Sequence, residues 1–177
     1  MSVQGSGPSE EAVKAAIARS SDATANGDGV IEFISFSIGD DQYGVAIMSV
    51  REIKGWSGVT HLPKQPDYVR GVLNLRGVMV PIIDLRCRFG QGLTDASSMH
   101  VVIIVQIGDK VVGLLADRVL DIVSFEASKI QKVPSVGGAE QADFLSGLIT
   151  IDDAMIALID LEHLLSSGNR GAVAAAA

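Results

Sequence analysis

The sequence predicts an all-β fold, in the main, made of two small five-stranded barrels that pack together, with short helical segments near the C-terminus. Three observations favour this fold class: short β-branched strands bounded by glycine turns, an internal repeat, and the small size of each repeat unit. A unit of roughly 60 residues buries little surface as an open sheet and leaves both sheet edges exposed. Closing each unit into a barrel and packing the barrels together removes both problems.

The composition suits one globular unit or two very small ones. The chain has 177 residues, of which 47% are hydrophobic and 20% are charged. A net charge of −7 and a pI of about 4.8 argue against a nucleic-acid partner, because proteins that bind nucleic acids carry basic surfaces. Cys87 is the only cysteine, so no intramolecular disulfide can form, which fits a reducing compartment.

The two ends of the chain differ in composition from the middle. Residues 1–30 are rich in Gly, Ser and Ala and predict a mobile tail, and residues 167–177 predict a disordered one. Residues 1–29 lack the basic start and apolar stretch of a signal peptide, and no apolar run approaches the roughly 18 residues that span a bilayer. We therefore expect a cytoplasmic protein without direct membrane insertion.

A repeat occupies the chain between these tails. Two shifts, of 69 residues and then of 76 residues, superimpose similar motifs of the first and second copies. The matched positions include Ile34 with Ile103, Gly44 with Gly113, Gly71 with Gly147, and Asp84 with Asp160. The second copy therefore holds seven extra residues, which we expect in a loop around residues 133–143.

Each copy predicts the same elements in the same order. A first strand leads through a Gly-Asp turn to a second strand, and a third strand, a long loop and a hairpin follow. The expected first and third strands are Phe33–Ile38 and Val50–Lys54 in one copy, and Val101–Ile107 and Val119–Val123 in the other. The last strand of the second copy runs into a brief helix, because Leu161, Leu164 and Leu165 share helical spacing.

The hairpin of the first copy places a charge at the tip of two apolar arms. Its turn is Arg76-Gly77, whereas the matching turn of the second copy is Asp152-Asp153. Residues 31–92 carry seven Lys/Arg and six Asp/Glu, whereas residues 93–165 carry four and eleven. These charges could simply be solvated turn residues. They could also belong to two hairpin tips that bind different proteins. Both interpretations stay open on this observation.

Residues that both copies share are explained by folding. Asp84 and Asp160 are therefore expected to cap strand ends rather than to form a catalytic pair. The three histidines lack the spacing of a metal site, and no catalytic nucleophile signature is present, so we predict no enzyme, metal or cofactor. Trp56 fits either a binding aromatic or a lid on a barrel end. The methionines expected in the core are Met48, Met79, Met99 and Met155.

Several motifs together carry a resemblance to a known family. Ile38-Gly-Asp-Asp-Gln-Tyr-Gly, Val50-Arg-Glu-Ile-Lys-Gly and the hairpin motif Asn-Leu-Arg-Gly-Val-Met-Val-Pro resemble the CheW-like chemotaxis coupling proteins. The resemblance covers about residues 31–166 and implies two SH3-like barrels, about 31–92 and 93–166, with an exchange of strands between them left open. It also implies a non-catalytic adaptor that joins chemoreceptors to the histidine kinase CheA.

The resemblance also implies a receptor contact at a groove between the barrels. The matching positions are Ile47, Val50, Glu52, Gly71, Arg76, Val101 and Val102. In this hypothesis the apolar residues among them accept the helical tip of a receptor, and the two charged residues set its register at the rim. The kinase would dock its own barrel domain on a barrel of this chain. The alternatives are a small ligand-binding or catalytic barrel that uses the same groove, and a homotypic assembly module.

Overall fold

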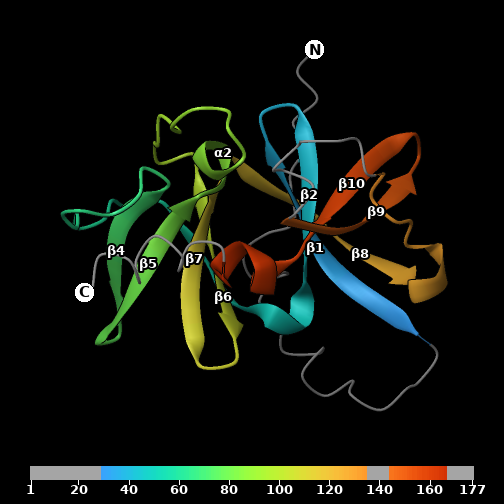
Figure 1. The fold of residues 1–177 in the computed structure, drawn as a ribbon, viewed down its shortest axis with the longest axis horizontal. Coiled ribbons are helices and arrows are strands. Elements are labelled where there is room, and N and C mark those ends of the chain that lie inside the picture. The colour runs from blue at the N-terminus through green and yellow to red at the C-terminus, as the bar shows by residue number, and fades with distance from the viewer. Residues whose placement is uncertain (1–28, 135–143, 167–177) are drawn as a thin grey trace.

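A computed structural model describes residues 29–134 and 144–166, which form two five-stranded sheets lying side by side (Figure 1). The first sheet has the strand order β8-β1-β2-β10-β9 and the second has the order β3-β6-β7-β5-β4. The first sheet comprises β1 (Val30–Ile38), β2 (Asp41–Ala46), β8 (Arg118–Glu126), β9 (Leu145–Ile151) and β10 (Ala154–Ile159). The second comprises β3 (Val50–Gly55), β4 (Val69–Leu75), β5 (Val78–Asp84), β6 (Val101–Ile107) and β7 (Lys110–Ala116).

Each sheet curls until its two edges approach each other. A bridge between Thr60 and Val72 joins the chain that follows β3 to β4, and a bridge between Gln131 and Leu148 joins the chain that follows β8 to β9. We call the first sheet barrel A and the second barrel B. The prediction of an all-β fold with two five-stranded units is confirmed. The predicted tails, apart from residues 29 and 30, and most of the expected second-copy loop lie outside the described residues.

The two barrels do not correspond to the two halves of the sequence. Barrel A combines β1 and β2 of the first copy with β8, β9 and β10 of the second, and barrel B combines β6 and β7 with β3, β4 and β5. Strands that are equivalent in the repeat occupy equivalent places in the two sheets. A division between residues 92 and 93 therefore separates strands that pair, such as β1 and β8. Each barrel contains strands from both halves of the sequence.

Matched glycines mark where each sheet turns from antiparallel to parallel pairing. Gly44 pairs with Leu158 between β2 and β10, and Gly113 pairs with Ile82 between β7 and β5. A Cβ atom on Gly113 would lie 2.7 Å from Val102 Cγ1 and would also contact the end of the Ile82 side chain. A Cβ atom on Gly44 would lie 3.1 Å from Leu158 Cδ2, so the parallel crossing is crowded in both barrels and favours glycine there.

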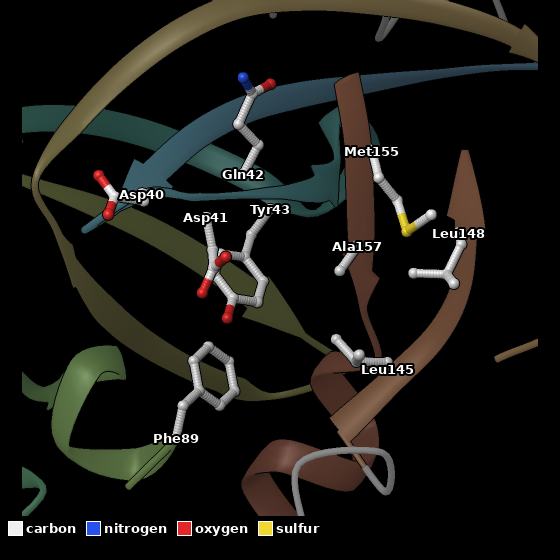
Figure 2. A pocket seen from close by; sticks show the side chains of 9 residues that line it. All are labelled: Asp40, Asp41, Gln42, Tyr43, Phe89, Leu145, Leu148, Met155 and Ala157. Carbon is white, nitrogen blue, oxygen red and sulfur yellow. The ribbon is translucent and has the colours of Figure 1, made fainter. Parts of the chain in front are cut away.

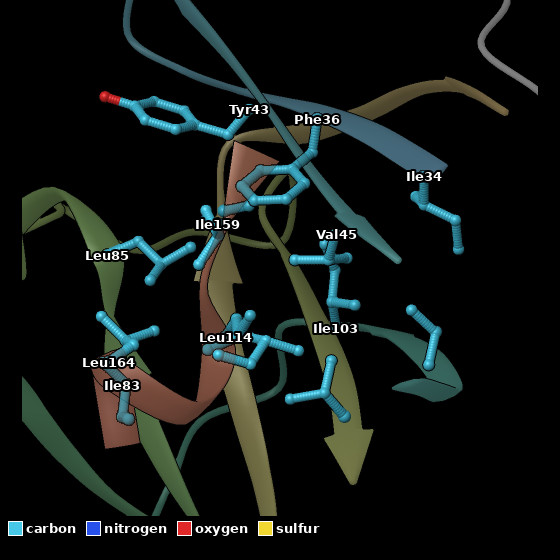
Figure 3. Close-up of a cluster of buried hydrophobic side chains, with 14 of the residues drawn as sticks. Ile34, Phe36, Tyr43, Val45, Ile83, Leu85, Ile103, Leu114, Ile159 and Leu164 are labelled. Carbon is cyan, nitrogen blue, oxygen red and sulfur yellow. The ribbon is translucent and has the colours of Figure 1, made fainter. Parts of the chain in front are cut away.

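Apolar side chains fill three clusters: the interior of each barrel and the space between the barrels. In β6, Ile103 and Val105 belong to the central cluster, whereas Val102 and Ile104 belong to the interior of barrel B. The strands read as continuous apolar runs because both of their faces are buried. Figure 3 shows side chains of both barrels meeting in the central cluster. The space between the barrels is therefore packed.

Two short helices follow matching hairpins and close the central cluster. Leu85 in α2 (Leu85–Arg88) is fully buried there, and Leu161 and Leu164 are buried from the helix at residues 161–166, as their spacing predicts. The 3-10 turns are η1 (Ile47–Ser49) and η2 (Ala127–Lys129). Among the described residues no helix is long and apolar enough to cross a membrane.

The paired aspartates lie at strand ends, but they cap the helices that follow rather than the strands, which differs from the prediction. The buried Asp84 side chain accepts hydrogen bonds from the Cys87 N–H and from the N–H and hydroxyl of Thr94. Asp160 accepts one from the His163 N–H. The prediction of core methionines is wrong, because the side chains stand on turns and outward strand faces. The exposed methionines are Met48 at 63%, Met79 at 55%, Met99 at 81% and Met155 at 58%.

Candidate protein-interaction surface

The tip of the β4–β5 hairpin holds Arg76 in an unusual backbone conformation. Arg76 has a φ of 52° and Gly77 a φ of 87°, which is the pattern of a type I′ turn. The Gly77 N–H donates to Asn74 Oδ1 at 2.9 Å and supports the turn. A left-handed conformation costs an ordinary residue about 1 kcal/mol relative to glycine. The arginine is therefore not the residue that the turn itself prefers.

The Arg76 side chain forms an ion pair with Glu52 from another strand. The guanidinium Nη1 lies 3.5 Å from Glu52 Oε2, and Lys54 Nζ lies 3.8 Å from Glu52 Oε1. β3 and β4 are opposite edges of one sheet, so only the closure of barrel B brings these charges together. Because the Arg76 side chain is 80% exposed, water screens the pair, and its contribution to stability is small. The guanidinium therefore remains available to a partner.

Gly71 lies inside β4 and shapes barrel B. Its φ is 147°, and a Cβ atom there would contact the backbone oxygen of Thr60, the residue that bridges to Val72. Gly147 occupies the matching position in barrel A, where a Cβ would contact Ile130 and Gln131. The structure thus gives Gly71 a folding role that the repeat itself supports.

The four apolar positions expected in an open groove are largely inside the protein. Ile47 and Val50 are 2% and 3% exposed and belong to the central cluster. Val102 is 2% exposed and points into barrel B, and Val101 is partly buried against the central cluster. The expectation that Ile47, Val50 and Val102 line an open groove is wrong for this conformation, because the two barrels pack directly against each other.

The structure adds two accessible apolar residues that sequence reasoning missed. Val78 is 56% exposed and Met79 is 55% exposed, directly after the Arg76 turn. We call Glu52, Arg76, Val78 and Met79 around this tip the hairpin surface, in which Val78 and Met79 extend from opposite faces of β5. The sequence of β5 is apolar throughout, and successive side chains of a strand face opposite sides. The sequence therefore did not show which of these side chains are exposed to solvent. The one sequence feature that could have indicated their exposure is their position at the start of a strand, directly after an exposed turn.

The matching hairpin of barrel A has the same turn and the opposite charge. Asp152 and Asp153 have φ values of 45° and 67°, and both are exposed. The contrast with Arg76 is therefore a real difference between two equivalent surfaces. Trp56, by comparison, is partly buried and packs against the apolar interior of barrel B.

Neither a candidate metal site nor an open groove between the barrels is found among the described residues. No group of three or more His, Cys, Asp or Glu side chains in residues 29–134 and 144–166 could hold a metal ion. The space between the barrels, where a catalytic groove was an alternative, is filled by the central cluster. The outer surface of the double barrel carries two hairpin tips of opposite charge.

The comparisons with known proteins agree with this architecture. The model of the CheW-like domain family matches residues 32–169. The chain belongs to the CheW family. A protein of Rhizobium etli described as "Probable chemotaxis protein CheW" is 47% identical over 135 residues, which cover 76% of this chain and 87% of the relative. The chemotaxis protein CheW of Klebsiella aerogenes is 41% identical over 136 residues, covering 77% and 82%.

A solved CheW structure has the same fold. The scaffolding protein TtCheW of Thermoanaerobacter tengcongensis superimposes with a TM-score of 0.70 and 33% sequence identity, covering 76% of this chain and 86% of that one. The double barrel that the repeat predicts is thus the CheW fold. The CheW relatives and this scaffolding protein support a scaffold role in chemotaxis signalling for the chain.

Proposed function

We propose that this CheW protein is a non-catalytic, cytoplasmic scaffold that couples transmembrane chemoreceptors to the histidine kinase CheA. The observation that carries the proposal is the match to chemotaxis CheW proteins over nearly the whole described fold. The packed seam between the barrels supports it as well, because a scaffold needs rigid outer surfaces rather than an enclosed reaction cavity.

The hairpin surface is the proposed contact for the cytoplasmic signalling tip of a receptor. Arg76 and Glu52 set the register of the receptor helices, and Val78 and Met79 supply exposed apolar area. The charge of Arg76 supports this role, because the equivalent turn of barrel A carries Asp152 at the same position.

The buried family positions act on this contact from inside. Ile47, Val50 and Val102 hold β3 and β6 in the packed core, and Gly71 lets β4 approach Thr60. Val101 is the one apolar member that is partly accessible. It pairs with Gly55 at one end of the β3–β6 ladder, whereas Glu52 pairs with Ile104. A substitution at the buried positions would therefore change receptor binding through the fold of barrel B.

The regulatory barrel domain of CheA is the proposed second partner, docking barrel against barrel. The opposite charges of the two hairpin tips support separate surfaces for separate partners. Each contact needs only micromolar strength, about −8 kcal/mol, because many linked contacts in an array add avidity.

The decisive experiment measures receptor-fragment binding to Arg76→Asp by isothermal titration calorimetry. We expect about tenfold weaker binding, because the new carboxylate removes the guanidinium and repels Glu52. The matched control is Asp152→Lys, which reverses charge at the same position of the equivalent turn in barrel A. It should leave receptor affinity within about twofold.

Circular dichroism must show that both variants remain folded, and a separate titration with the CheA barrel domain tests the second surface. Unchanged receptor affinity in folded Arg76→Asp would remove the hairpin surface from the proposal. An equal loss in both variants would mean that overall charge, rather than this surface, governs binding.

A further inference from the structure

A cavity of about 250 Å³ opens in barrel A, away from the hairpin surface of barrel B. It lies between the start of β2, the β9–β10 hairpin and the segment after α2. Its lining residues are Asp40, Asp41, Gln42, Tyr43, Phe89, Leu145, Leu148, Met155 and Ala157. Figure 2 shows Asp41 and Tyr43 facing the side chains of Leu145, Leu148 and Ala157 across this space.

The floor of the cavity is preformed by aromatic stacking. The Tyr43 and Phe89 rings lie 4.9 Å apart with an interplanar angle of 18°, and Tyr43 also stacks on Phe36. Tyr43 and Phe89 are 8% and 2% exposed, so their rings are held by the surrounding core. Met155, by contrast, is exposed at the rim and has an unbranched side chain that adapts to different shapes.

One edge of the cavity is acidic, and no lining residue is basic. Asp40 and Asp41 are exposed there, and their charges have no counterpart among the nine residues of the cavity. Burial, and after it the charge of Asp41, raise the pKa of Tyr43, so its phenol stays protonated at neutral pH. The cavity thus joins an apolar wall to a negatively charged edge.

The equivalent place in barrel B has different chemistry. The positions that match Asp41, Tyr43 and Ala157 under the repeat hold Lys110, Val112 and Pro81. Both barrels fold with the same strand order, so the fold does not require the acid, the aromatic ring or the small alanine. These three residues are specific to barrel A, as expected for a binding site added to one copy.

We propose that this cavity binds a protein segment that presents one large apolar side chain next to a lysine or arginine. Its volume is below the roughly 300 Å³ at which pockets for drug-sized ligands begin, so it suits a side chain rather than a cofactor. The apolar chain would lie between Tyr43 and Leu148, and the cation would face Asp41. This site is independent of the proposed receptor contact.

The test uses the full chain with ¹³C-labelled methionine methyl groups and three synthetic peptides. The peptides are Gly-Lys-Leu-Lys-Gly, the acidic Gly-Glu-Leu-Glu-Gly and the neutral Gly-Ser-Leu-Ser-Gly. The lysine peptide should shift the Met155 methyl resonance in a saturable way and leave those of Met48, Met79 and Met99 in place. The acidic peptide should cause no shift, and the neutral one should bind more weakly than the lysine peptide.

Two charge variants refine the test. Asp41→Asn should weaken binding of the lysine peptide about two- to fivefold, as expected for an exposed charge. Asp109→Asn removes one charge from the equivalent turn of barrel B and should leave the affinity unchanged. The proposal would be overturned by the lack of a saturable Met155 shift, or by equal shifts of the Met48, Met79 and Met99 methyl groups. Equal binding of the three peptides or equal effects of the two variants would also overturn it.

Discussion

Gly71→Ala separates a folding role of this residue from a direct receptor contact. A Cβ atom at position 71 would contact the Thr60 backbone oxygen, and the φ of 147° is rarely adopted by residues with side chains. The variant must strain this backbone at the positive φ and also push Thr60 away from Val72 to relieve the contact. Both responses affect the bridge that closes barrel B.

The expected cost follows from these two responses. Backbone strain of this kind costs about 1–3 kcal/mol. The Thr60–Val72 bridge consists of two hydrogen bonds of 2.9 and 2.8 Å, and losing both costs about 2 kcal/mol more. The sum, about 3–5 kcal/mol, is a large share of the stability of a typical domain and should lower Tm by about 10 °C.

Urea and thermal unfolding followed by circular dichroism measure this loss. The matched control is Gly77→Ala, which also places alanine at a positive φ but meets no atom within 4 Å. Strain alone should cost the control about 1 kcal/mol. If Gly71→Ala proves no less stable than Gly77→Ala, the close approach of Thr60 is unimportant. If it is stable yet no longer binds receptor, Gly71 belongs to the contact surface after all.

Three further predictions test the packing of the site. Val50→Lys should cost about 3–5 kcal/mol in urea unfolding because the side chain is buried, whereas Met48→Lys at an exposed neighbour should be nearly neutral; equal stabilities would place Val50 at the surface. Thr94→Val should cost about 1.5–3 kcal/mol through loss of its 2.7 Å hydrogen bond to buried Asp84, and an unchanged unfolding midpoint would contradict that role. Burial and the nearby Asp84 raise the pKa of Cys87, so a disulfide reagent at pH 8 should react more slowly with folded than with urea-unfolded protein; equal rates would argue against a shielded thiol.

Local sequence patterns predict the elements well and the site only in part. The Gly-Asp turns, the hairpins and the leucine spacing at residues 161–166 each depend on neighbouring residues, so their structures follow from short segments. The sequence placed Arg76 and Glu52 on the same rim but did not predict that they form an ion pair. Their 3.5 Å contact requires the closure of barrel B, which no local pattern encodes.

The same limit explains the wrong predictions. Met79 and Val50 both lie in or beside apolar strands, yet one is exposed and the other is in the central cluster. A strand with two apolar faces shows no alternation that would identify the buried side. Only the packing of one barrel on the other assigns the faces.

The amino-acid order by itself determined the repeat, the order of the elements, the placing of the paired aspartates at strand ends and the CheW family. The folded chain alone decided that β1 pairs with β8 across the two copies, that the seam is packed, and that Glu52 meets Arg76. The physical reason is that turns and helices depend on near neighbours, whereas strand partners and buried faces are selected by the free energy of closing two sheets against each other.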